Sequence, residues 1–284
     1  MRTWDEVLVV VRSSPGWKDL EKYLEPYFDK SPQLEEVWSI MDQVWDDLGL
    51  NNKNYDEERF SEYYTHPVWL LNGLWIEADT VSMQHRKGMA QYVEGDSPKV
   101  LDYGGGFGAL AKQIALHCPE ADIEIYEPHA SNFAHDNIRD FDNIKIVDKL
   151  NNKEYNYIFT TDVIEHIDDP VSLIININRH LATGGIIVAA WNFTPCIKCH
   201  LPENFHFRYT MHRWIIPSLG FSYIEKAKGG HGHIYEKVKE INSHLLKSAY
   251  RLAFVSKAVY PVFRVLSFAK GLIKNTTAQL RLLL

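Results

Sequence analysis

Cysteine is scarce in this sequence, which contains three among 284 residues: Cys118, Cys196 and Cys199. Three cysteines make no disulfide framework, so we expect a reducing compartment. The chain also lacks an uninterrupted apolar run near the roughly 18 residues that a membrane-spanning helix needs. No apolar segment after the N-terminus resembles a secretory signal. We therefore expect a cytoplasmic protein without a membrane-spanning helix.

Acidic residues are absent from residues 241–284, although the whole chain has a formal net charge of −7. Seven basic residues occupy this segment, so the first 240 residues carry a net charge of −14. The seven are Lys247, Arg251, Lys257, Arg264, Lys270, Lys274 and Arg281. A mildly acidic body therefore carries a basic and apolar C-terminal segment, which we call the basic tail.

The basic tail has a spacing that predicts two amphipathic helices hinged at Pro261. Basic residues four or seven positions apart share one helical face on each side of this proline, with apolar residues on the other face. We expect such helices to bind an anionic membrane surface, at the inner face of the membrane. The alternative is a helical pair that packs on the N-terminal region or on another subunit. Nucleic acid is a weaker alternative, because the acidic body would repel phosphate.

The chain divides into three regions. Its length suits one sizeable domain with a substantial appendage. Residues 1–95 have apolar residues at helical spacing, clearest over residues 34–50, and no alternating strand pattern. Residues 96–240 alternate strand and helix patterns, and residues 241–284 are the basic tail. We predict an N-terminal helical region, an α/β core and C-terminal helices.

Short apolar strands alternate with helical patterns in the second region. Strand patterns cover residues 99–103, 122–127, 144–147, 155–162 and 184–192, and helical patterns cover residues 107–118, 130–140 and 170–182. Only a short polar connection separates the third strand from the fourth. Two further strands, 221–227 and 233–238, flank the turn KGGHG. This order predicts a doubly wound, mostly parallel sheet with a C-terminal antiparallel hairpin.

The densest glycine run, LDYGGGFG at residues 101–108, lies between a predicted strand and a predicted helix. Its pattern is D-x-G-x-G-x-G from Asp102 onward. Glycine permits a tight turn and lets a ligand come against bare backbone, and the helix that follows directs free N–H groups to the same place. The patterned flanks exclude a linker, and the lack of Gly-Lys-Ser/Thr excludes a Walker phosphate loop. A nicotinamide dinucleotide site has the different spacing G-x-G-x-x-G, and it stays an alternative.

Acidic residues follow the next two strands. Glu127 lies 23 residues beyond Gly104, where an acid can accept hydrogen bonds from both ribose hydroxyls of an adenosine. Asp148, just past the third strand, is placed to accept from an adenine amino group. The structural alternative for both is an ordinary surface acid.

Four segments together resemble class I S-adenosylmethionine-dependent methyltransferases: VLDYGGGFG, IEIYEP, YNYIFTTDVIEHIDDP and HLATGGIIVAAWN. The resemblance covers residues 95–240 and implies a Rossmann-like core that binds S-adenosyl-L-methionine. It places Asp102 and Gly104 near the methionine amino group, Glu127 on the ribose, Asp148 near the adenine, and residues 161–166 along the methyl donor. The cofactor-binding residues that it implies are Asp102, Gly104, Gly106, Gly108, Glu127, Pro128, Asp148, Thr161 and Asp162. The chain departs from the family pattern at Gly105 and in the short connection before residue 155.

Catalytic candidates come from the strand ends, because ligands of an open parallel sheet lie beyond the carboxyl ends of its strands. Glu165 and His166 follow the fourth predicted strand, and His231 lies in the hairpin turn. Methyl transfer to oxygen needs a base for the acceptor proton, and a histidine pKa of about 6.5 suits that role. His166 is the first choice. The structural alternative is a histidine that braces the turn.

A metal site is a competing interpretation of the same residues. Asp162, Glu165 and His166, joined by His206 or His231, offer oxygen and imidazole ligands. The E-x-x-E-H version in quinone-precursor and small-RNA 2′-O-methyltransferases is similar, but Asp stands first here, and we predict no metal. The string CIKCH, residues 196–200, matches a haem-attachment motif. Nothing indicates export, and a zinc site would need further ligands, so we expect this segment to be a loop that covers the acceptor.

Together these observations predict a methyltransferase that modifies a hydroxyl group of a small molecule or a glycan intermediate near the inner membrane face. Residues 1–95 would cover the acceptor. Two alternatives stay open: a metal-assisted methyltransferase that acts on an RNA 2′-hydroxyl, and a degenerate fold used only for binding. A nicotinamide oxidoreductase is the other class of enzyme to exclude.

Overall fold

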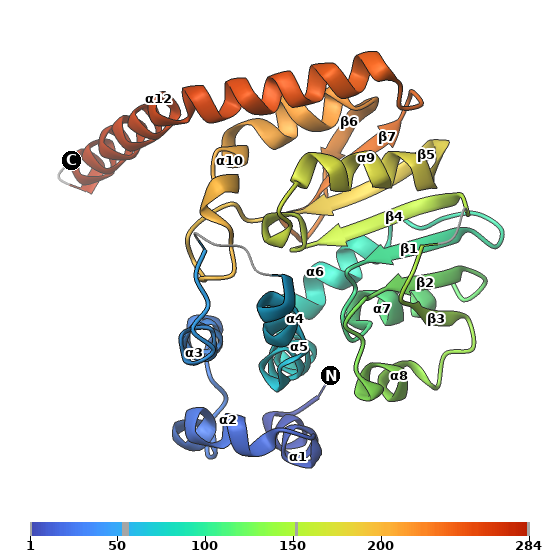
Figure 1. The fold of residues 1–284 in the computed structure, drawn as a ribbon, viewed down its shortest axis with the longest axis vertical. Helices are drawn as coiled ribbons and strands as arrows, with labels where there is room; N and C mark the ends of the chain where they lie inside the picture. Colours follow the sequence, from blue (N-terminus) through green and yellow to red (C-terminus); the bar gives the residue numbers. More distant parts are fainter. Residues whose placement is uncertain (1, 53–56, 151–152, 283–284) are drawn as a thin grey trace.

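A seven-stranded sheet forms the centre of the protein (Figure 1). The computed structural model describes residues 2–52, 57–150 and 153–282, with the side chains of residues 57 and 271–282 left outside the description. The strands are β1 (Lys99–Tyr103), β2 (Asp122–Tyr126), β3 (Ile144–Val147), β4 (Tyr155–Thr161), β5 (Leu181–Ala190), β6 (Phe221–Lys226) and β7 (His233–Lys237).

The strand order is β3-β2-β1-β4-β5-β7-β6. Strands β1 to β5 are parallel, and β7 pairs antiparallel with both β5 and β6. The predicted doubly wound, mostly parallel sheet with an antiparallel hairpin is therefore confirmed. The order reverses between β1 and β4, and ligands of such sheets bind in the crevice at this reversal. Tyr103 pairs with Thr160 across it, so residues 102–108 and 161–166 leave the same edge.

Alternate residues of the central strands enter two apolar clusters, one on each face of the sheet. Leu101, Ile158 and Ile187 pack in the cluster that contains the helix α9 (Pro170–His180). The residues next to them, such as Val100, pack in the cluster that contains α7 (Ala109–His117). Helix α8 (Asn132–Ile138) follows β2, and no helix lies between β3 and β4 in the described part of that connection. Burial on both faces explains why the second half of β5, IIVAA, is continuously apolar.

Six helices precede the sheet: α1 (Trp4–Ser13), α2 (Trp17–Leu24), α3 (Leu34–Asp47), α4 (Glu57–Thr65), α5 (Pro67–Ala78) and α6 (Thr80–Ala90), with a 3-10 turn η1 (Glu25–Tyr27). Helices α1 to α5 share a third apolar cluster, whereas Met89 and Ala90 of α6 pack in the cluster that contains α7. Glu77 of α5 is 5% exposed and holds them to the core, because its carboxylate pairs with Lys112 Nζ of α7 at 2.6 Å and with Arg2 Nε at 3.1 Å. The predicted helix over residues 34–50 is α3, which ends at Asp47.

Residues 191–220 connect β5 to β6 through four short helical segments: η3 (Pro202–Asn204), α10 (Phe207–Thr210), the π-helix η4 (Met211–Ile215) and α11 (Ile216–Ser218). The 3-10 turn η2 (Ile164–His166), which follows β4, lies beside this connection. Ile197, Cys199 and Leu201 are buried among the N-terminal helices. The Lys198 N–H donates to Oδ1 of Asp42 at 2.7 Å. The CIKCH segment is therefore held between α3 and the sheet edge.

The basic tail forms one helix, α12 (Ser243–Leu282), so the prediction of two helices hinged at Pro261 is wrong. Proline removes one backbone hydrogen bond and tends to kink a helix, but it does not stop this one. Figure 1 shows that the C-terminal half extends away from the core. The predicted face of Lys270, Lys274 and Arg281 falls partly outside the described side chains, which end at Lys270.

The expectation that no segment is apolar enough to cross a membrane needs correction. Residues Ser243–Lys270 of α12 are long enough, and an 18-residue window has a mean hydropathy of 1.4 with 6% of it buried in the protein. Two basic residues interrupt the apolar stretch, so it contains no uninterrupted apolar run of the length that a membrane-spanning helix needs. By length and composition alone, this helix qualifies as a membrane span.

Candidate functional site

The glycine turn after β1 adopts a backbone that side chains rarely permit. Gly104, Gly106 and Gly108 have φ angles of +70°, +53° and +82°. A Cβ on Gly104 would lie 2.5 Å from Cγ2 of Val163, so the turn packs directly against the end of β4. A Cβ on Gly106 would meet nothing within 4 Å. The turn is therefore closely packed at Gly104 and open at Gly106, so a ligand can lie against its backbone there.

Glu127 ties this turn to the end of β2. Its Oε2 accepts the Gly106 N–H at 3.1 Å, and its Oε1 accepts the His129 N–H at 3.1 Å. Burial raises the pKa of this carboxyl. Pro128 and Asp148 are exposed at the ends of β2 and β3. The predicted ribose acid thus lies against the glycine turn, whereas the predicted adenine contact stands on the surface.

Asp102 has a buried carboxylate whose capacity to accept hydrogen bonds is only partly used. It is 2% exposed, and its Oδ2 has no hydrogen-bond partner in the described part of the chain. Burial raises its pKa to about 7, against the opposing influence of Arg86. Arg86 reaches this region from α6, and burial lowers the pKa of its guanidinium. A buried carboxylate without a donor is costly, so this end of β1 is suited to a cationic or hydrogen-bond-donating ligand.

Asp162 begins the segment after β4 with a strained backbone. Its φ is +55°, a region that residues other than glycine seldom adopt and that often marks functional sites. Its Oδ1 lies 2.8 Å from Nε2 of His231, and both side chains are 45% exposed. Burial raises the pKa of Asp162, but the His231 hydrogen bond and positive neighbours outweigh it and lower the pKa. The ring of His85, from α6, lies 6.1 Å from that of His231.

Glu165 and His166 form the turn η2 just beyond. Glu165 is 1% exposed, and its Oε1 accepts the Asn192 N–H at 2.7 Å. Burial, reinforced by Asp162, raises its pKa to about 8. Burial also lowers the pKa of His166 to about 3. Thr161, the last residue of β4, has a buried Oγ1 with no hydrogen-bond partner among the described residues.

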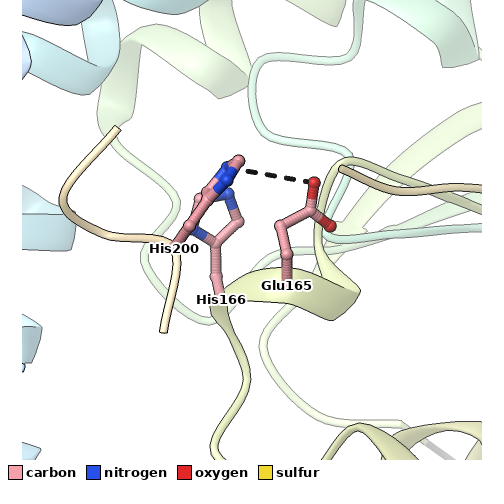
Figure 2. Close-up of side chains that lie close together, drawn as sticks. All are labelled: Glu165, His166 and His200. Carbon is pink, nitrogen blue, oxygen red and sulfur yellow. Dashed lines mark ion pairs between the residues drawn. The ribbon is translucent and has the colours of Figure 1, made fainter. Parts of the chain in front are cut away.

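His200 is the histidine that joins Glu165 and His166 (Figure 2). The sequence pattern proposed His206 or His231 for that place, and the structure puts both elsewhere. Nδ1 of His206 lies 2.7 Å from Oγ of Ser256 on α12, where it helps to hold that helix. His231 pairs with Asp162.

Two aromatic side chains of the N-terminal helices lie over His166. The rings of Tyr64 and Trp69 are 6.4 Å and 6.0 Å from the His166 ring, both edge-on, and 5.2 Å from each other. Tyr64 also stacks with His129, which follows β2, at 5.9 Å. The N-terminal helices therefore reach the same edge as the glycine turn.

Residues 81–221 match the model of a family described as a methyltransferase domain. This part of the chain is a methyltransferase domain. Its cofactor is S-adenosylmethionine. No protein of curated function matches the sequence.

The methyltransferase domain also has likenesses among solved structures. One is YcgJ from Bacillus subtilis, at 17% identity over 37% of this chain and 49% of that one, with a TM-score of 0.33. Another is an O-methyltransferase family protein from Burkholderia thailandensis, at 11% identity over 77% and 76%, with a TM-score of 0.46. A third is an O-methyltransferase family 2 protein from Planctomyces limnophilus in complex with apigenin, at 17% identity over 65% and 62%, with a TM-score of 0.44. The chain thus spans less than two thirds of the length of the first and third.

The residues present fit S-adenosylmethionine. Its ammonium and sulfonium groups are positive, and Asp102, with its unmatched oxygen, together with Asp162 would face them. Arg86 would hold its carboxylate, and Glu127 would hold its ribose. The open side of Gly106 leaves room for the ligand against the backbone. When bound, the cofactor supplies an activated methyl group.

Arg86, His200, Tyr64 and Trp69 are site residues that sequence analysis did not find. Arg86 sits in an ordinary amphipathic helix, and nothing in its neighbourhood distinguishes it from a surface arginine. His200 has a signal in the sequence, because it ends the CIKCH string, but that string by itself predicts only a loop that covers the acceptor. Only the tertiary contacts bring these side chains to the sheet edge.

Replacing Gly106 by Ala should weaken cofactor binding without unfolding the protein. The new methyl group projects into the open side of the turn, so we expect the affinity for S-adenosylmethionine to fall about tenfold or more, measured by calorimetric titration. The left-handed backbone adds a stability cost of about 1–2 kcal/mol, measured by denaturant unfolding.

Gly184→Ala is the matched control. Gly184 has a φ of +81° and nothing within 4 Å of its Cβ, but it precedes the buried part of β5 at the opposite end of the sheet. It should show the same stability cost and unchanged affinity. Equal affinities for the two variants would contradict the placement of the cofactor at Gly106.

Proposed function

We propose that the chain transfers the methyl group of S-adenosylmethionine to a hydroxyl group of a small molecule or a glycan intermediate. The observation that carries this proposal is the pair of Asp162 and His231, 2.8 Å apart, beside the glycine turn. A hydroxyl acceptor needs a base as the bond forms, because its neutral oxygen is a weak nucleophile. A histidine held by a carboxylate provides one.

His231 is a better base than His166. Its Nε2 donates to Asp162, which leaves the lone pair of Nδ1 for the acceptor proton. The hydrogen bond to Asp162 raises the pKa of His231, while burial, Arg86 and Lys226 oppose the rise, and His85 faces it from α6. His166, with a pKa of about 3, is a poor proton acceptor near neutral pH.

The transfer then follows from these positions. S-adenosylmethionine, held by Asp102, Arg86 and Glu127, would supply the methyl group that the acceptor oxygen takes. The hydroxyl proton passes to Nδ1 of His231, and Asp162 stabilises the imidazolium. The products are the methyl ether, S-adenosylhomocysteine and a protonated histidine that solvent can discharge.

The side chains over His166 support an acceptor with a flat or apolar body. Tyr64 and Trp69 present aromatic rings there, and aromatic side chains pack well against phenols and the apolar faces of sugars. Their helices come from the region that the sequence predicts to cover the acceptor. These contacts favour a compact acceptor over a long polynucleotide.

His231→Gln tests the base. Glutamine retains an N–H donor for Asp162 but cannot take a proton, so kcat should fall about 100-fold or more with the affinity for S-adenosylmethionine unchanged. The assay measures S-adenosylhomocysteine release with a panel of phenols and sugars. The control is His135→Gln, an exposed histidine of α8, which should not change kcat.

Two outcomes of this experiment would contradict the proposal. One is an unchanged kcat in His231→Gln with a hydroxyl acceptor. The other is a panel in which amines are methylated and no hydroxyl is.

We further propose that α12 binds an anionic membrane surface, with the protein on the cytoplasmic side. Its side chains after Phe263 are exposed as far as Lys270, and among them Val265 is 68% and Phe268 71% exposed. Basic residues lie among these apolar ones, which suits acidic headgroups above an apolar layer. A spanning position is disfavoured, because Lys257 and Arg264 would lie in hydrocarbon and the first half of α12 packs against α9 and α10.

Arg264→Gln combined with Lys270→Gln tests this surface. Each charge contributes about 1 kcal/mol near anionic lipid, so binding to phosphatidylserine-containing vesicles should weaken about tenfold or more in a flotation assay. Wild-type binding should fall as salt rises and should be lost on neutral phosphatidylcholine vesicles. The control pair Lys18→Gln and Lys30→Gln, exposed on the N-terminal region, should bind like wild type. Equal losses in both pairs would reject α12 as the binding surface.

A further inference from the structure

Three metal-ligating side chains converge beside the methyl-transfer site (Figure 2). Glu165 and His166 come from η2, and His200 comes from the CIKCH segment 34 positions later in the chain. One ligand atom of each lies within 4.8 Å of the other two, and Nε2 of His200 is 3.9 Å from Oε1 of Glu165. Ligands of one zinc ion lie roughly 3.3 Å apart, so side-chain movements on the order of 1 Å would close the site.

Both imidazoles are already held in the tautomer that a metal needs. Nδ1 of His166 lies 3.2 Å from the carbonyl oxygen of Cys199, and Nδ1 of His200 lies 2.8 Å from that of Thr194. A carbonyl oxygen only accepts, so each Nδ1 carries the proton and each Nε2 keeps its lone pair. Metal-bound histidines are oriented in this way by a second hydrogen bond.

Glu165 is a carboxylate without a matching cation. It is 1% exposed, its Oε1 is held by the Asn192 N–H, and its Oε2 is buried with no hydrogen-bond partner in the described part of the chain. Its charged neighbour Asp162 is also negative, so it does not neutralise the charge of Glu165. A buried carboxylate in this position calls for a cation or for its own proton.

We propose that Glu165, His166 and His200 bind one divalent first-row transition-metal ion of the zinc type. Two imidazole nitrogens and one carboxylate suit Zn²⁺, Co²⁺ and similar ions, whereas Mg²⁺ and Ca²⁺ prefer oxygen ligands alone. The set also leaves coordination positions open, which is typical of catalytic rather than structural sites. This assignment replaces the absence of a metal that the sequence predicts.

The open position gives the metal a role that rests on the proposed function. Tyr64 and Trp69 lie at His166, so an acceptor packed against them would bring its hydroxyl oxygen to the metal. A divalent ion there would make the acceptor hydroxyl lose its proton more readily, and Nδ1 of His231 would take that proton. Metal binding itself depends only on the three side chains.

Cobalt titration of the full chain tests the site. After treatment with a chelator, the protein should bind one Co²⁺ per chain, with the visible absorption bands of cobalt held by nitrogen and oxygen, and Zn²⁺ should displace it. His200→Asn and Glu165→Gln should each weaken binding about 100-fold or more, since each removes one of three ligands. Glutamine keeps an oxygen for the Asn192 N–H.

His180→Asn is the matched control and should bind Co²⁺ like wild type. Nδ1 of His180, on α9, also lies at a backbone carbonyl, that of Asn176 at 2.9 Å, but His180 belongs to no cluster of ligands in the described residues. Thermal unfolding and S-adenosylmethionine titration of each metal-free variant show that it is folded. If His200→Asn does not fold, Glu165→Gln decides the question alone.

The proposal is overturned if the wild-type protein binds Co²⁺ and Zn²⁺ no more tightly than the Glu165→Gln variant does. In that case Glu165 carries its own proton. A loss in His180→Asn equal to that in His200→Asn overturns it as well. Cobalt binding does not require methyl transfer. A chain that binds the metal through these residues but methylates no hydroxyl would therefore overturn the proposed function alone.

Discussion

The burial of carboxylates at one edge of the sheet is the constraint on which the site depends. Asp102 near the end of β1 and Glu165 just after β4 are buried, and each needs a positive or hydrogen-bonding partner to offset its desolvation. Asp162, which follows β4, is 45% exposed and pairs with His231. Arg86 and His231 supply part of that compensation from inside the chain. The remainder fits ligands that are positively charged, which S-adenosylmethionine and a divalent metal ion both are.

The fold creates this constraint through its strand order. Because β1 and β4 are neighbours with their other connections running to opposite sides, their carboxyl ends open on a common crevice. The glycine turn lets the chain leave β1 against Val163, and Glu127 fastens the turn from β2. Glu77 holds the N-terminal helices against this edge, which brings Arg86, Tyr64 and Trp69 to it.

The sequence predicts the sheet, and it predicts that the glycine turn and Glu127 lie at one edge of that sheet, because those features are local. A short continuous segment of sequence encodes each of them: the glycine pattern, the acid after β2 and the apolar strands. The metal ligands are harder, since His200 reaches Glu165 only through the fold of residues 191–206, and His206 looked equally suitable by spacing. The break in α12 was wrongly predicted because one proline does not by itself end a helix whose flanks remain helical.

Calorimetric titration of the full chain with S-adenosylmethionine, in two buffers of different ionisation enthalpy at pH 7, tests the central claim most directly. Asp102, with a pKa of about 7, is partly protonated when free and should ionise beside the bound ammonium group. We predict that one molecule binds per chain and that binding releases a fraction of a proton, which Asp102→Asn abolishes. Absence of binding, or binding with the same heat in both buffers, would contradict it.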